Sequence, residues 1–447
     1  MEKHFFEKTN PVKLFFMATI PGAISMLAAS AYLLIDGILV GRLLGEECFA
    51  ALNLAMPYVN ICFAISDMIG VGSSVVIAIE IGKKQEKEAN SVFTASILII
   101  EISAVVTGVI MYLLAPVLLS FSGAEGNLSR LAIRYLRIFA VCGPVTTIIY
   151  AMDNFLKDCG KIRFSLVLNL IFALSCGVFE YILIKYTDMG LDGSAYGYTL
   201  GAFVIILIFF TPFVLGKMPL KFASPAYGFK MAYRIFANGF SIFLNSMASQ
   251  IPAIIINTIL VGLGGARAVS VYGMLLIIDS VAQPLMYGTT DAIQPAVSYN
   301  WGAGNMDRVR KLEKITYIVL VILGAVFACV CFFFPNVIAS MFADNEGVLT
   351  LAVTAIPLFG LGYLMRWLSF ATVGFMLSIE ASGGAILISF CEALFFPILS
   401  LVLLRGLGLN GIWLNFTSSA FLTGIMCIFF TAKTLKYVKS TELSSRV

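Results

Sequence analysis

Residues 32–41 read YLLIDGILVG, so one carboxylate, Asp36, stands inside a run that is otherwise apolar, glycine or tyrosine. A charged side chain at the centre of a bilayer costs about 2.5–3.5 kcal/mol on insertion scales, so an acid in such a run is usually retained for a function. The stretch IDGILVG at 35–41 returns as INTILVG at 256–262. The chain therefore contains an internal repeat, and only its first copy has the acid.

The composition is that of an integral membrane protein. Of the 447 residues, 60% are hydrophobic and 12% are charged, and the mean hydropathy is +0.96. The net charge of +4 is small and the basic residues are dispersed, which argues against a nucleic-acid partner. The nine cysteines lie mostly in apolar runs without a CxxC pair, so we interpret them as buried hydrophobes.

Apolar stretches long enough to cross a bilayer recur along the whole chain, and we predict an all-α fold of twelve transmembrane helices. The first stretch loosely resembles a signal peptide, but it continues into Asp36, so we interpret it as a retained helix. The predicted spans are 13–41, 50–82, 92–121, 131–156, 163–186, 192–216, 232–262, 267–300, 313–341, 352–379, 385–405 and 411–436.

The charges of the connecting loops predict the orientation. Both termini and most even-numbered loops are rich in Lys and Arg, whereas the odd-numbered loops carry mainly acids. By the positive-inside rule, the basic segments are cytoplasmic. We therefore expect a multi-pass protein of the plasma membrane with both termini in the cytoplasm.

Further pairs of similar segments extend the repeat over the whole chain. APVLLSF at 115–121 corresponds to FPNVIASMF at 334–342, and LDGSAYGYT at 191–199 corresponds to LNGIWLNFT at 409–417. Because each copy has an even number of spans, both should share one orientation, related by a pseudo-two-fold axis along the membrane normal. We predict two six-helix bundles around a central cleft, with boundaries at 1–216 for the first lobe, 217–231 for a cytoplasmic linker and 232–447 for the second lobe.

Three separated motifs carry a family resemblance. They are IPGAISMLAASAYLLIDGILVGRLLG at 20–45, GLDGSAYGYT at 190–199 and QPAVSYNWGAGNMDRVRK at 294–311. In this order, and with twelve spans in two halves, the chain resembles the multidrug and toxic compound extrusion (MATE) family. The resemblance implies a cation-coupled antiporter that exports bulky amphipathic or cationic drugs and toxins by alternating access.

The resemblance also implies roles for residues of the first helix. Asp36 matches an aspartate that, in one bacterial and archaeal branch of the family, is proposed to bind the coupling ion. Pro21 lies about four turns earlier, where a proline can bend the helix. The alternative for Pro21 is a static packing role.

Helices five and six supply the other residues of the expected coupling site. Glu180 matches a fifth-helix position where this branch usually has Asp, and Cys176 stands where the branch has Asn. Since sodium prefers oxygen ligands, this cysteine weighs against a sodium site and leaves a proton favoured, although sodium at Asp36 and Glu180 stays possible. Tyr198 and Thr199 fall where the family places a helix-six hydroxyl, and either can instead be a core residue.

The chemistry of these acids can be argued from the residues themselves. Two carboxylates that face one poorly solvated pocket cannot both ionise cheaply, so one should hold a proton and the pair should titrate together. The only histidine is His4, near the N-terminus, so carboxylates must carry the proton. The alternative is that Asp36 and Glu180 pair with a basic group or the backbone and are structural. We expect no cofactor beyond the coupling ion.

The second half lacks the acid, because Asn257 stands opposite Asp36, so we place the coupling site in the first half. Further polar residues within the spans are weaker candidates, and an ion pair inside a bundle would account for several of them. These are Asp67, Asp279, Asp291, Arg366 and Glu392. Asp67, Asp279 or Asp291 can alternatively line the cleft and attract cationic substrates.

Two other functions remain in view. Flippases for lipid-linked sugars have a similar span count, but usually a basic central cavity, whereas Arg366 is almost the only basic residue deep in a span here. A membrane-embedded enzyme is disfavoured because neither HExxH nor GxSxG occurs. We therefore expect a transporter that is not an enzyme, acts as a monomer in the lipid bilayer, and takes small organic cations or amphipathic drugs.

Overall fold

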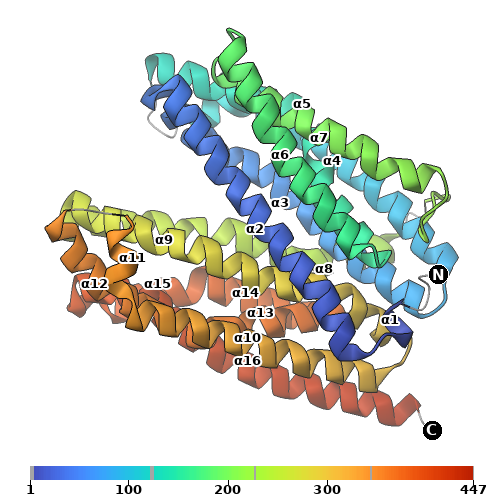
Figure 1. The fold of residues 1–447 in the computed structure, drawn as a ribbon. Helices are drawn as coiled ribbons and strands as arrows, with labels where there is room; N and C mark the ends of the chain where they lie inside the picture. Colours follow the sequence, from blue (N-terminus) through green and yellow to red (C-terminus); the bar gives the residue numbers. More distant parts are fainter. Residues whose placement is uncertain (1–4, 121–124, 226–227, 343–344, 446–447) are drawn as a thin grey trace. The chain divides into compact units, whose positions relative to one another are not determined.

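The computed structural model describes residues 5–120, 125–225, 228–342 and 345–445, and every regular element in them is a helix. His4 lies outside the described residues. The α-helices labelled in Figure 1 are, in chain order, α1 (Phe5–Lys8), α2 (Pro11–Leu44), α3 (Glu46–Gly82), α4 (Glu86–Ser120), α5 (Gly126–Asp158), α6 (Ile162–Tyr186), α7 (Leu191–Val214), α8 (Phe229–Ala248), α9 (Gln250–Gly302), α10 (Met306–Phe333), α11 (Pro335–Ser340), α12 (Glu346–Gly360), α13 (Tyr363–Ser378), α14 (Ser382–Phe390), α15 (Phe396–Leu403) and α16 (Leu409–Ser445). Two short elements lie between them: the π-helical turn η1 (Cys391–Phe395) before α15 and the 3₁₀ turn η2 (Arg405–Leu407) before α16.

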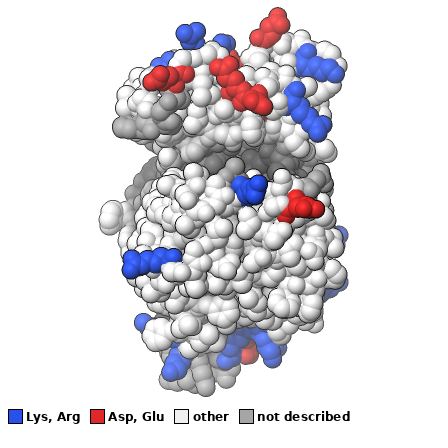
Figure 2. All heavy atoms as spheres, turned by 90° about the vertical axis from the view of Figure 1, so that its left-hand side faces the viewer, with Lys and Arg blue, Asp and Glu red and all other residues white. Residues whose placement is uncertain are grey.

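The described helices confirm a multi-pass membrane fold. Eleven stretches of the described chain are long and apolar enough to cross a bilayer when α9 is divided at Gly265, whose backbone is not helical, with α8 joined to the first part of α9 and α14 joined to α15. Helices α12 and α13, which meet at a bend of 42°, form a further candidate span. Large apolar side chains remain exposed along them; Leu113 is 67% exposed and Phe429 is 66% exposed. Such side chains are stable in contact with lipid. On the face that Figure 2 shows, most of the surface is uncharged, and the Lys, Arg, Asp and Glu side chains gather mainly in the upper part of the view and along its lower edge.

Contacts within the chain define two compact units. The first comprises Ile24–Gly239 together with the described part of Met1–Lys8. The second comprises Thr9–Ala23 and the described part of Phe240–Val447, so helix α2 contributes residues to both. Each unit has its own buried apolar core, which includes Tyr135 and Phe139 in the first and Tyr363 and Trp413 in the second.

Three of the predicted spans are less regular than the sequence suggested. The helix expected at 313–341 ends at Phe333, because Pro335 disfavours helical backbone in the residue before it. The helix expected at 352–379 is broken between α12 and α13, where Gly362 packs against the ring of Phe416. The helix expected at 385–405 contains the turn η1, which widens the helix just before Pro397.

Helices α6 and α7 run side by side in the first unit, and glycines on α7 set their separation (Figure 1). Gly193, Gly197 and Gly201 recur every four residues and therefore share one face of the helix. A Cβ atom at Gly197 would lie 2.5 Å from the Cα of Glu180, and one at Gly201 would lie 2.8 Å from the backbone nitrogen of Cys176. This small-residue ladder brings the two backbones together, as is common between membrane helices.

A methyl group added to this ladder should destabilise the first unit. We expect Gly201→Ala to lower the thermal unfolding midpoint of the purified protein in detergent, because overpacking a rigid contact costs about 1–3 kcal/mol. Gly177→Ala on α6 is the matched control, since its Cβ would meet Ile35 at an ordinary 3.6 Å. Equal unfolding midpoints for the two variants would contradict the close approach of α6 and α7.

Candidate coupling site

The side chains of the candidate site come from three helices of the first unit. On α2, Tyr32 and Asp36 are one turn apart and face the same way. On α6, Glu180 lies one turn after Cys176, and on α7 Ser194 lies one turn before Tyr198. Asp36 is 5% exposed and Glu180 is fully buried. The tertiary fold thus brings the two predicted acids into one interior region.

Hydroxyl groups bind the two acids. The Ser194 hydroxyl donates a hydrogen bond of 2.8 Å to Asp36 Oδ1, and the Tyr32 hydroxyl donates one of 3.4 Å to Glu180 Oε2. The two carboxyl groups also interact directly with each other. Among the described residues, neither acid forms a salt bridge with Lys or Arg. The buried oxygen Oε1 of Glu180 accepts no hydrogen bond from these residues. A basic group therefore does not account for the burial of this pair.

Aromatic rings cluster around Tyr198, beside the acid pair. The ring of Tyr198 lies 5.7 Å from Tyr32, 5.4 Å from Phe172, 5.5 Å from Phe139 and 5.9 Å from Phe63, measured between centroids. These contacts join residues from α2, α3, α5, α6 and α7. Tyr32, which packs in this ring cluster and bonds to Glu180, connects it to the acids. Both acids are buried from water, which strengthens their electrostatic interactions.

The other predicted residues take different positions. The Cys176 thiol donates to the backbone oxygen of Tyr198 at 3.6 Å, so it links α6 to α7. The Thr199 hydroxyl donates to the Ala195 oxygen of its own helix at 2.8 Å, and no contact joins it to the acids. Pro21 is inside α2 but belongs to the second compact unit, so it is not part of this cluster.

Three residues of the cluster were not predicted from the sequence. They are Ser194, Tyr32 and Tyr135, the last of which is buried and interacts with Ser194 and Asp36. Helical spacing offered a signal for two of them, because Tyr32 precedes Asp36 by four residues and Ser194 precedes Tyr198 by four. Tyr135 carries no such signal, since it comes from α5.

The second unit has its own polar cluster, which lines a cavity of about 340 Å³. Arg366 Nη1 lies 2.5 Å from Glu392 Oε1, which also accepts a hydrogen bond of 2.7 Å from Ser369. The Tyr363 hydroxyl donates to Asp279 at 3.1 Å, and this aspartate interacts with Arg366. Here the acids do have a basic partner. Of the further polar candidates, Asp67 lies in the first unit and interacts with Tyr150, and Asp291 is buried in the second.

These observations define a polytopic α-helical membrane protein with a buried carboxyl pair in one of its two units. A family model described as MatE matches the chain twice, at residues 21–182 and 241–402. The two matches begin 220 residues apart (241 − 21), in agreement with the repeat seen in the sequence. The chain therefore belongs to the MatE family, the multidrug and toxic compound extrusion proteins.

Individual relatives are distant in sequence but match over most of the chain. The multidrug export protein MepA of Staphylococcus saprophyticus is 21% identical over 420 residues, which cover 92% of this chain and 91% of MepA. The probable multidrug resistance protein YoeA of Bacillus subtilis is 23% identical over 74% of each chain. A crystal structure of a MATE protein in complex with MaL6 matches with a TM-score of 0.92 at 19% identity, covering 98% of this chain and 99% of the other.

The ion pair of the second unit yields a stability prediction. We expect Glu392→Gln to destabilise the protein by up to about 3–5 kcal/mol, because it leaves the charge of Arg366 buried without its nearest partner. The double variant Arg366→Met with Glu392→Gln removes both charges and should recover much of the loss. Thermal unfolding in detergent compares the two. A single variant as stable as the double variant would show that the pair is not coupled.

Proposed function

We propose that this protein is a cation-coupled antiporter that exports bulky amphipathic or cationic compounds from the cell, with a proton as the coupling ion. Membership of the MatE family supports this proposal. So do the names of the relatives, which describe multidrug export and multidrug resistance. The loop charges further support a plasma-membrane protein with cytoplasmic termini. We further propose that it acts as a monomer on small-molecule substrates.

The observation that carries the proposal is the buried pair Asp36 and Glu180. Two ionised carboxylates at low dielectric repel each other strongly, and the described residues offer them hydroxyl groups in place of a basic partner. Binding a proton or another monovalent cation relieves this repulsion. The pair therefore has the chemistry of a reversible cation carrier.

In this mechanism the bound cation biases the conformational equilibrium. A site that holds its cation differently in the inward-facing and outward-facing states converts the ion gradient into a population shift between them. The membrane potential contributes about 2.3 kcal/mol per charge per 100 mV. Only a group that titrates or binds an ion can use this free energy, and Asp36 and Glu180 are such groups.

The donor atoms of the site favour a proton over sodium as the coupling ion. A sodium ion needs several oxygen ligands, and the thiol of Cys176 is a poor substitute for an amide oxygen. In addition, that thiol contacts the Tyr198 backbone rather than the acid oxygens. A proton needs only one carboxyl oxygen, and the hydroxyls of Ser194 and Tyr32 can reorient to either protonation state.

The alternative function, a flippase for lipid-linked sugars, receives less support. A pyrophosphate group would need free basic side chains in the substrate path. Arg366, the deepest basic residue singled out in the sequence, is already paired with Glu392 in the second unit. A cationic or amphipathic cargo fits the acidic interior of the first unit better.

The central prediction concerns Asp36. We expect Asp36→Asn to abolish gradient-driven efflux of a fluorescent organic cation from proteoliposomes while the protein stays folded, because the amide is nearly isosteric but does not titrate. Asn257→Ala, at the corresponding position of the repeat, is the matched control and should retain most of the efflux. Full efflux by the Asp36 variant, or equal losses in both variants, would refute a coupling site in the first unit.

The partner acid yields a separate prediction. If Glu180 shares the cation with Asp36, Glu180→Gln should either abolish efflux or shift its dependence on pH, because it removes the like charge beside Asp36. Efflux is measured over a range of pH with the pH gradient and the sodium gradient imposed separately. An unchanged pH profile at full activity would place Glu180 outside the coupling mechanism.

A further inference from the structure

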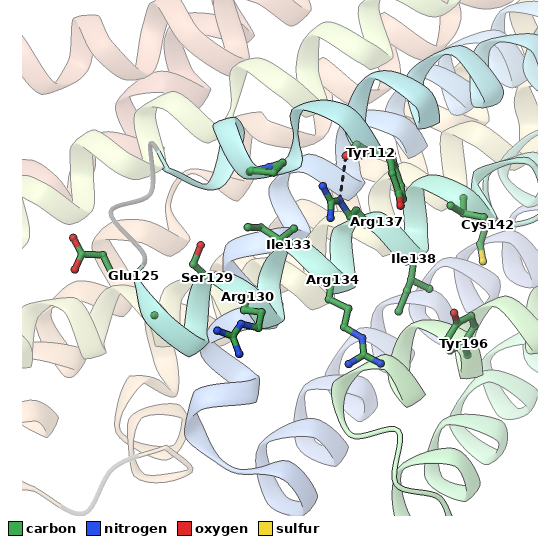
Figure 3. Close-up of a pocket in the computed structure, with 13 residues that line it drawn as sticks. Tyr112, Glu125, Ser129, Arg130, Ile133, Arg134, Arg137, Ile138, Cys142 and Tyr196 are labelled. Atoms are coloured by element: carbon green, nitrogen blue, oxygen red, sulfur yellow. Dashed lines mark hydrogen bonds between the residues drawn. The ribbon is translucent and has the colours of Figure 1, made fainter.

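The first unit has a cavity that takes no part in the coupling mechanism. Its volume is about 870 Å³, and it is bounded by α4, α5 and α7. Three arginines, Arg130, Arg134 and Arg137, line it from one side of α5, together with Tyr112 of α4 and Tyr196 of α7 (Figure 3). This is a concentration of positive charge on a helix that also crosses the membrane.

The three arginines differ in how they are paired. Arg134 forms an ion pair with Asp192. Arg137 donates from Nε to the Tyr112 backbone oxygen at 3.3 Å, and its guanidinium lies 4.9 Å from the centre of the Tyr112 ring. Arg130 has no partner among the described residues. Two guanidinium groups therefore keep most of their donors available, and neither is neutralised by a paired carboxylate.

The three arginines lie near the first end of α5, from the headgroup level at Arg130 to just inside the edge of the hydrocarbon core at Arg137. A helix of 33 residues is roughly 50 Å long, whereas the hydrocarbon core is about 30 Å thick, so roughly 10 Å extends beyond the core at each end. Arg130 and Arg134 lie within about 12 Å of the first residue, and Arg137 lies about 16 Å from it. Side chains on a helix tilt toward its N-terminus, which moves all three guanidinium groups outward.

The surroundings of the cavity are those of a lipid-facing surface. Leu113 and Val117 on α4 are 67% and 52% exposed, Val141 on α5 is 67% exposed, and Tyr196 on α7 is 41% exposed. Exposed apolar side chains on membrane-spanning helices contact acyl chains. A lipid can therefore reach the arginines from within its own leaflet.

The charged side chains that line the cavity favour an anionic ligand. Asp192 is balanced by Arg134. The carboxylate of Glu125 lies at the end of the lining group farthest from Arg137 in Figure 3, and it offsets one of the two remaining guanidinium groups. One positive charge is left, with planar guanidinium donors that match the oxygens of a phosphate group.

We propose that this cavity binds the phosphodiester headgroup of an anionic glycerophospholipid, on the Arg130 and Arg137 guanidinium groups. The acyl chains lie along the exposed apolar side chains of α4, α5 and α7. Asp36 and Glu180 take no part in this site, so the lipid is a structural ligand of the first unit and is distinct from the exported substrate.

The test uses the purified full-length protein, stripped of lipid in detergent, with phosphatidylglycerol as the probe. Native mass spectrometry counts bound lipid, and thermal unfolding measures protection. We expect the unaltered protein to hold one phosphatidylglycerol tightly. The double variant Arg130→Gln with Arg137→Gln should bind this lipid more weakly by about tenfold or more, because charge-assisted hydrogen bonds are lost. Arg405→Gln, at an exposed turn of the second unit, is the matched control and should bind as the unaltered protein does.

Three results would overturn the proposal. These are equal phosphatidylglycerol binding by the double variant and the control, equal binding of phosphatidylcholine with the same acyl chains, and full protection by inorganic phosphate alone. The single variant Arg130→Gln, whose side chain has no internal partner to lose, gives the same comparison if the double variant is poorly folded. No ion gradient is needed, so the result is independent of the proposed transport function.

Discussion

The repulsion between two carboxyl groups held away from water is the constraint on which the first unit depends. Asp36 and Glu180 are both buried, and the contacts they receive in the described structure are hydroxyl groups and each other. Such an arrangement is costly unless a proton or cation is present. The nearby rings and the close packing of α6 on α7 hold the two acids together. If the helices moved apart, the contacts of Gly197 and Gly201 on α7 with α6 would be lost.

The two units handle buried charge in different ways, although they derive from one repeated sequence. In the cavity of the second unit Arg366 pairs with Glu392 and also interacts with Asp279, so both of these acids have a basic neighbour within the protein. At Asp36 and Glu180 in the first unit no Lys or Arg of the described residues supplies that compensation, so it has to come from a bound proton or cation. This difference supports the proposal that the coupling ion binds in the first half, whereas the second half has a polar cavity with its own ion pair.

Much of the architecture could be predicted from the sequence. Apolar runs of sufficient length determine the membrane spans because lipid cannot satisfy backbone polar groups. Local irregularities were harder to predict. The breaks at Phe334 and at Leu361–Gly362 and the turn η1 arise where a proline or a packing contact competes with regular helix. The effect of a proline on its helix depends on the neighbours that can satisfy the freed backbone groups.

The sequence by itself determined that the chain crosses the membrane many times, that it is duplicated, and that Asp36 and Glu180 lie within apolar helices. Only the tertiary structure decided that these acids meet, that Ser194, Tyr32 and Tyr135 join them, and that Thr199 bonds to its own helix. The physical reason is that hydropathy depends on composition along one helix. Which faces of α2, α5, α6 and α7 meet depends on side-chain packing between segments that are distant in the sequence.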